Sequence, residues 1–151
     1  MDRRKSLAST VKFDASHPNA LAIYCSDGRF TESVEQLLYG LGHGRLDTLT
    51  LPGGPALFNI WSASSSARQA MTEAARFLIE QHKIRRVILV AHRGCGYYKA
   101  MCSGDSPQKV EERQRNDLAL AARELRGPQG RVGTDLFYAR VDGARVIFDP
   151  L

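Results

Sequence analysis

The chain has 151 residues, of which 43% are hydrophobic and 25% are charged, a size and composition that suit one globular domain with one core. The net charge is +5, but the basic residues are interleaved with acids and form no stripe with aromatics, so no nucleic-acid partner is expected. No apolar run suits a signal peptide or a membrane span, and the three cysteines form no disulfide framework. We therefore expect a cytoplasmic protein without a membrane partner. A short arm over residues 1–19 precedes a single domain over residues 20–151.

Two short and continuously apolar runs, residues 20–24 and residues 87–91, predict strands that are buried on both faces of a parallel sheet. Between them, Thr31 can cap a helix whose apolar residues follow the three-four spacing and which Gly42 and Gly44 end. A short strand is predicted over residues 47–51, and a second helix over residues 67–81.

The last third of the chain predicts a helix followed by a hairpin. Residues 109–125 carry spaced apolar side chains among many charges and end at Gly127 and Pro128, which is typical of a surface helix. Residues 136–141 and 144–148 read as two strands joined by the tight turn Asp142–Gly143. The predicted fold class is α/β: a mostly parallel central β-sheet flanked by helices, with an antiparallel hairpin at its C-terminal edge.

A polar motif follows each of the two buried strands: residues 25–29, with the sequence CSDGR, and residues 92–95, with the sequence HRGC. The carboxyl ends of parallel strands share one edge of a sheet, so Cys25, His92 and Cys95 are predicted to meet there. A lone cysteine at a strand end is usually a core residue, and a lone histidine is usually satisfied by a backbone partner. Two thiolates and an imidazole together are ligands suited to zinc, and three protein ligands leave a coordination position for water, as in catalytic zinc sites.

Asp27 and Arg29 stand on either side of Gly28, next to the first cysteine. If the chain continues extended, side chains two residues apart share a face, and the two are predicted to point to the same side. An aspartate beside a metal-bound water can accept a hydrogen bond from it, while an arginine keeps that carboxylate ionised and oriented. The competing interpretation is a simple surface salt bridge.

The two motifs together resemble the signature of the β-class carbonic anhydrases. The resemblance implies that Cys25, His92 and Cys95 hold one Zn²⁺ ion, that Asp27 orients the attacking nucleophile and that Arg29 supports Asp27. It also implies reversible hydration of carbon dioxide to bicarbonate, a small-molecule substrate, and a homodimer or higher homo-oligomer. In some members of the family the aspartate turns onto the zinc and closes the site.

The chain departs from the family pattern at its second strand, which is followed by Pro52-Gly53-Gly54 where relatives usually have an Arg-Asn-Ala-Gly type of sequence. The glycines are kept and the polar pair is lost. Two alternatives therefore stay open: hydrolysis of carbonyl sulfide or carbon disulfide on the same site, and a non-catalytic zinc-binding protein. A cysteine phosphatase is not favoured, because Thr31 stands where its arginine would be, six residues after Cys25.

Overall fold

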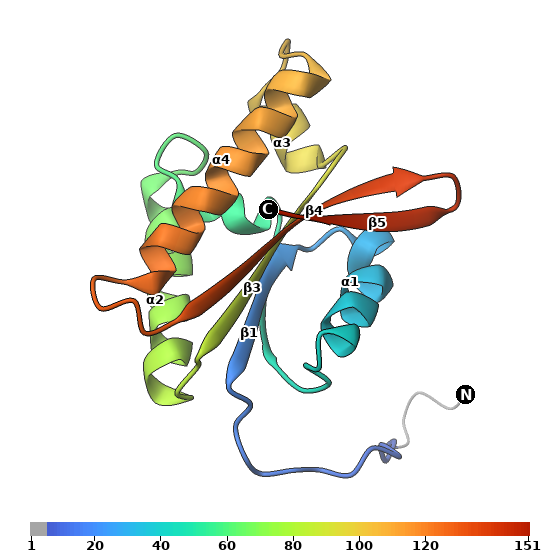
Figure 1. The fold of residues 1–151 in the computed structure, drawn as a ribbon, viewed down its shortest axis with the longest axis vertical. Helices are drawn as coiled ribbons and strands as arrows, with labels where there is room; N and C mark the ends of the chain where they lie inside the picture. The colour runs from blue at the N-terminus through green and yellow to red at the C-terminus, as the bar shows by residue number, and fades with distance from the viewer. Residues whose placement is uncertain (1–5) are drawn as a thin grey trace.

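A computed structural model of the protein describes residues 6–151 and contains five strands, four α-helices and one 3-10 helix in that range. Figure 1 shows the helices on either side of a central sheet that the strands form. In chain order the elements are β1 (Ala20–Cys25), α1 (Gly28–Gly40), β2 (Asp47–Leu51), η1 (Gly54–Phe58), α2 (Ser65–Gln81), β3 (Arg86–His92), α3 (Gly96–Met101), α4 (Pro107–Arg126), β4 (Gly133–Asp142) and β5 (Arg145–Pro150).

The strands form one sheet in the order β2-β1-β3-β4-β5. The first four are parallel, and β5 pairs antiparallel with β4. The register sets Cys25 beside Leu51 of β2, and Tyr24 of β1 beside Val90 of β3, so the ends of β1 and β3 lie next to each other. The α/β fold class with an antiparallel edge hairpin is confirmed.

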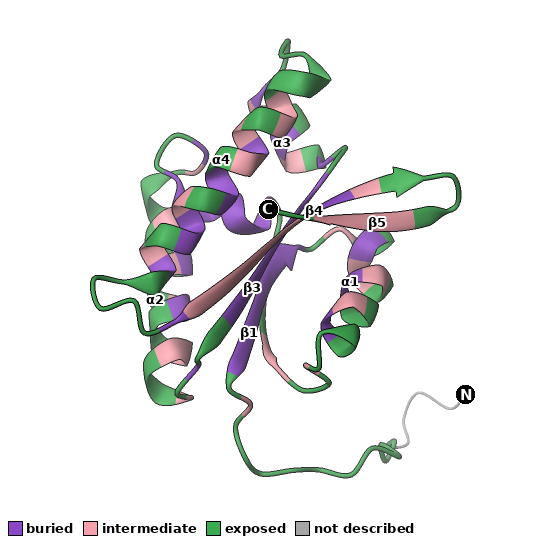
Figure 2. Ribbon diagram, in the orientation of Figure 1, coloured by how far each residue is buried: buried purple, intermediate pink, exposed green. Residues whose placement is uncertain are grey.

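Both faces of the sheet are covered, which explains why β1 and β3 are apolar without alternation. Figure 2 shows these two strands buried along nearly their whole length. One face packs on α2, η1 and α4, and its cluster includes Leu21, Ile23, Val87, Leu89, Met71, Ala75, Leu118 and Ala121. The opposite face packs on α1, and its cluster includes Ala22, Tyr24, Ile88, Val90, Phe30, Val34 and Leu38.

The chain leaves β1 and β3 toward opposite faces of the sheet. After β1 it forms α1 on one face, and after β3 it forms α3 and then α4, which packs on the other. Where neighbouring strands diverge in this way, a crevice opens beyond their carboxyl ends, and α/β proteins bind ligands there. The fold therefore brings both polar motifs to one crevice.

The first helix begins earlier than the sequence predicted, and two short elements were not predicted. The N-cap of α1 is Asp27 rather than Thr31, because the Asp27 carboxylate accepts a hydrogen bond from the backbone N–H of Arg29. Aspartate and threonine are both good N-caps, so the sequence alone did not separate them. The elements η1 and α3 contain five and six residues, too few for a periodic pattern. The helix α4 begins at Pro107, capped by Ser106.

Within the predicted arm, residues 1–5 lie outside the described residues, and residues 6–19 form no helix or strand. Arg45 holds the part of the arm around Asp14 and Ser16. Its Nη1 contacts the Asp14 carboxylate at 2.7 Å, and its Nη2 donates to the carbonyl of Ser16 at 2.6 Å. Beyond this anchor, Leu7, Val11 and Phe13 are exposed. No helix within residues 6–151 is long and apolar enough to cross a membrane.

Candidate metal centre

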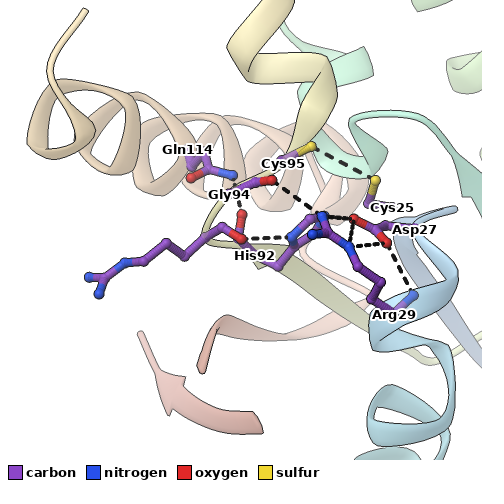
Figure 3. A network of polar contacts seen from close by, with 8 residues as sticks. Cys25, Asp27, Arg29, His92, Gly94, Cys95 and Gln114 are labelled. Atoms are coloured by element: carbon purple, nitrogen blue, oxygen red, sulfur yellow. Dashed lines mark hydrogen bonds and ion pairs between the residues drawn. The ribbon is translucent and has the colours of Figure 1, made fainter. Parts of the chain in front are cut away.

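Three candidate metal ligands from separate segments meet at the crevice. Cys25 ends β1, His92 ends β3, and Cys95 is the N-cap residue of α3. Their ligand atoms all lie within 4.8 Å of one another, and all three residues are buried. Figure 3 shows the two sulfur atoms facing each other above the His92 ring. The convergence that the sequence predicted for these three residues is present.

The distances within this cluster suit a tetrahedral zinc ion. The sulfur atoms of Cys25 and Cys95 are 3.8 Å apart, and a tetrahedral ion with Zn–S bonds of about 2.3 Å would separate them by roughly 3.8 Å. The Nδ1 atom of His92 lies 3.0 Å from the carbonyl oxygen of Arg93. That oxygen can only accept, so Nδ1 carries the proton and Nε2 presents its lone pair. Nε2 is buried and has no hydrogen-bond partner among the described residues; a metal ion would satisfy it.

The thiols of Cys25 and Cys95 lie within hydrogen-bond distance, and each shifts the pKa of the other. Donation from the Cys95 thiol lowers the pKa of Cys25, and the backbone N–H groups of Gly53 and Asp27 contribute in the same direction. The hydrogen bond to Cys25 and then burial raise the pKa of Cys95. Because thiolates rather than thiols bind metals, this lowering of the Cys25 pKa favours the form of Cys25 that binds a metal.

The glycine pair after β2 lets the loop approach Cys25 closely. A Cβ on Gly54 would stand 2.7 Å from the backbone nitrogen of Cys25, and one on Gly53 would stand 2.6 Å from the Tyr97 ring. Gly53 has a φ angle of 85° and Gly54 one of 47°, and residues with a side chain disfavour such positive values. Close packing against Cys25 and Tyr97 accounts for glycine at both positions.

Asp27 and Arg29 form a salt bridge at the edge of the cluster. Arg29 Nη2 contacts the Asp27 carboxylate at 2.6 Å, and Arg29 Nε contacts its two oxygens at 3.0 and 3.1 Å. These hydrogen bonds lower the pKa of Asp27 to about 2, so the carboxylate is ionised at neutral pH. Its Oδ2 lies 3.9 Å from His92 Nε2. Asp27 is 17% exposed and Arg29 71%, so the carboxylate faces the cluster while the guanidinium faces outward.

The prediction of an extended chain at this motif was wrong, although the two side chains do pair. Asp27 caps α1 and Arg29 lies in the first turn of that helix. The residues face each other because the capping carboxylate turns back over the helix N-terminus. The same carboxylate therefore caps the start of α1 and borders the cluster of Cys25, His92 and Cys95.

Sequence reasoning missed two buried polar residues of α4 behind the cluster, Gln114 and Asp117. Gln114 donates to the carbonyl of His92, and Asp117 accepts from Tyr98 in α3. The only signal in the sequence is a polar side chain on the apolar stripe of the helix. In a segment so rich in charge, that signal did not distinguish them from surface residues.

Comparisons with known proteins agree on the architecture. No protein-family model matches the chain. An uncharacterized protein from Rickettsia bellii is 27% identical over 132 residues, which covers 83% of this chain and 78% of that protein. Among solved structures, β-carbonic anhydrase isoform I from Trichomonas vaginalis covers 93% of this chain and 87% of its own, with 15% identity and a TM-score of 0.56.

Two further solved structures give the same picture. The Coccomyxa β-carbonic anhydrase in complex with acetazolamide covers 90% of this chain and 74% of its own, at 14% identity and a TM-score of 0.55. The β-carbonic anhydrase CafA of Aspergillus fumigatus covers 89% and 76%, at 16% identity and a TM-score of 0.53. Likeness at such identities establishes architecture alone. By its strand order, its helix layers and these similarities, the chain has the fold of the β-carbonic anhydrases.

Proposed function

We propose that this protein is a zinc-dependent enzyme that hydrates carbon dioxide reversibly to bicarbonate. One observation carries the proposal: the Cys25, His92 and Cys95 ligand atoms converge beside an ionised Asp27 that Arg29 holds in place. This combination lies at the strand-end crevice of a β-carbonic anhydrase fold. A buried Cys₂His set alone would suit a structural metal, whereas an oriented free acceptor beside it suits chemistry on a small molecule.

Cys25, His92 and Cys95 would hold the zinc ion. A zinc ion bound by three protein ligands acidifies water and so supplies a nucleophile near neutral pH. Two thiolates already offset the charge of the cation, so an adjacent hydrogen-bond acceptor matters more here than beside three imidazoles. The Nδ1–H of His92 donates to the backbone of Arg93, which fixes the orientation of the ring.

Asp27 is the proposed acceptor. Arg29 contacts both of its oxygens, Oδ1 through Nε and Oδ2 through Nη2, which leaves their remaining lone pairs directed elsewhere and keeps the carboxylate from rotating. At a pKa of about 2, Asp27 does not donate at neutral pH and can only accept, so it selects one orientation of a bound water. Arg29 reaches toward the carbonyl of Gly94 at 3.5 Å and thereby connects the two motifs.

The test is zinc content by elemental analysis together with stopped-flow hydration of carbon dioxide on the same preparation. We expect one zinc per chain and hydration well above the uncatalysed rate. Zinc without hydration, but with sulfide release from carbonyl sulfide or carbon disulfide, would instead favour the hydrolase alternative. Zinc with neither activity would favour a non-catalytic protein.

We further propose a homodimer or higher oligomer in a reducing compartment, the cytoplasm. Two thiolate ligands need reduced cysteines, and all three cysteines are free.

Exposed large apolar side chains are the residues that an association between copies would cover, and those of the arm and of the loop after η1 are Leu7, Val11, Phe13, Ile60 and Trp61. Sedimentation velocity should give at least twice the monomer mass; a monomer at all accessible concentrations would contradict this proposal.

A further inference from the structure

The helix α4 carries two polar side chains that are almost completely buried, Gln114 and Asp117, each 1% exposed. They are three residues apart, so they lie on the same face of the helix. Buried amides and carboxylates are costly unless their hydrogen bonds are satisfied. Both are satisfied, and their partners include His92 itself and Tyr98, three residues after Cys95.

Gln114 supports the backbone of His92. Its Nε2 donates to the His92 carbonyl oxygen at 2.7 Å, and its Oε1 accepts from the hydroxyl of Tyr138 at 3.1 Å. Tyr138 lies in β4 and is 1% exposed. Figure 3 shows the Gln114 side chain pointing toward the backbone of His92. The end of β3 is therefore held from α4 while the imidazole faces the cluster.

Asp117 supports the segments around the two cysteines. Its Oδ2 accepts from the Tyr98 hydroxyl and its Oδ1 from the Asn59 side chain, both at 2.5 Å. Burial raises the pKa of Tyr98, so the phenol stays protonated and is the donor. Tyr98 packs in one cluster with Cys25 and Cys95.

Asn59 extends this support to the other side of the cluster. It is the C-cap of η1, the turn that begins at Gly54 against the backbone of Cys25. Asp117 thus joins α4 to α3, which begins after Cys95, and to η1, which packs on Cys25. The contacts of α4 reach all three ligand segments.

We propose that Gln114 and Asp117 are positioning residues that hold the three ligand side chains at metal-binding spacing, Gln114 through His92 and Asp117 through the cysteine segments. This inference rests on the metal site of the proposed function. When the ligand side chains are already in place, metal binding does not carry the entropic cost of ordering them. Residues that hydrogen-bond to metal ligands commonly change the affinity of a protein for its metal. A purely structural tie would instead change the stability of the fold and leave the affinity of the folded protein for metal unaltered.

The test compares variants of the full chain by Zn²⁺ affinity, measured in competition with a chromogenic chelator, and by the absorption spectrum of bound Co²⁺. Gln114→Met and Asp117→Asn should each weaken zinc binding by about 10- to 100-fold and alter the Co²⁺ spectrum. The double variant Asn59→Asp with Asp117→Asn reverses the direction of one hydrogen bond and keeps the buried charge, so it should restore most of the affinity.

Leu118→Ala is the matched control, because Leu118 is a fully buried neighbour on α4 that makes no polar contact. It should lower the unfolding midpoint and leave both metal readouts unchanged. If Gln114→Met fails to fold, Tyr138→Phe takes its place in the test, and if Asp117→Asn fails to fold, Tyr98→Phe does. Each of these two substitutions removes only a hydroxyl from the same hydrogen-bond network.

Wild-type affinity in the folded variants, or an equal loss in Leu118→Ala, would overturn the positioning role. Failure of the double variant to regain affinity would overturn the part assigned to Asp117. Failure of the wild-type protein to bind either ion would instead overturn the proposed metal site itself, and the positioning role with it.

Discussion

At the scale of single residues, Asp27 combines a helix cap with the catalytic role that we propose for it. Its carboxylate caps α1 by accepting from the Arg29 backbone and also lies 3.9 Å from the free nitrogen of His92. The helix N-terminus and the guanidinium both stabilise its negative charge. Capping and chemistry can be separated experimentally, because asparagine caps helices as well as aspartate does.

Asp27→Asn should therefore retain the fold and the zinc but lose most of the carbon dioxide hydration. The amide keeps an oxygen for the cap, but it is uncharged and is held differently by Arg29. Elemental analysis and stopped-flow assays of the same sample measure the two quantities. Glu32→Gln removes the same charge from an exposed position of α1 and should behave as wild type. Full activity in zinc-loaded Asp27→Asn would refute the role of Asp27.

His92→Ala should lose zinc, because it removes the nitrogen that has no other partner among the described residues. The remaining two thiols do not form a site of comparable affinity. Equilibrium dialysis against zinc measures the loss. His43→Ala, a loop imidazole outside the cluster, is the control and should bind as wild type does. Undiminished zinc binding by His92→Ala would place the metal elsewhere.

At the scale of elements, most of the sheet and the long helices could be predicted from the sequence, because buried parallel strands are continuously apolar and helices repeat every three to four residues. The strand Asp47–Leu51 was predicted with its observed bounds. The contacts that tie α4 to the site could not be predicted. Gln114 and Asp117 look like surface residues until Tyr138, Tyr98 and Asn59 fold onto them from distant segments.

The glycine pair after β2 gives a test at this scale. Gly54→Ala should lower the free energy of unfolding by more than the about 1–3 kcal/mol expected for a residue held at positive φ, because its Cβ would also press on the backbone of Cys25. Gly143→Ala has a comparable φ of 58° in open space and isolates the backbone cost. Chemical denaturation measures both. An equal loss in the two variants would show that close packing against Cys25 contributes nothing.

At the scale of the whole molecule, the cluster of Cys25, His92 and Cys95 lies between the two faces of the fold, since Cys25 leads into α1 and Cys95 into α3 and α4. An ion bound to the three ligands would link these layers and stabilise the folded state by mass action. The gain is about 2.7 kcal/mol when free zinc is about 100 times its dissociation constant. Chelation should therefore lower the thermal midpoint, and zinc, but not magnesium, should restore it. Scanning calorimetry with and without chelator measures this; an unchanged midpoint would contradict the predicted linkage.

We propose that one zinc ion, held by Cys25, His92 and Cys95, makes this protein a catalyst of carbon dioxide hydration. The most direct measurement is a titration of metal-free protein with zinc while the hydration rate is followed by stopped flow. We predict that the rate rises linearly and reaches a plateau at one zinc per chain. Saturable zinc binding without any rise in the hydration rate would contradict it.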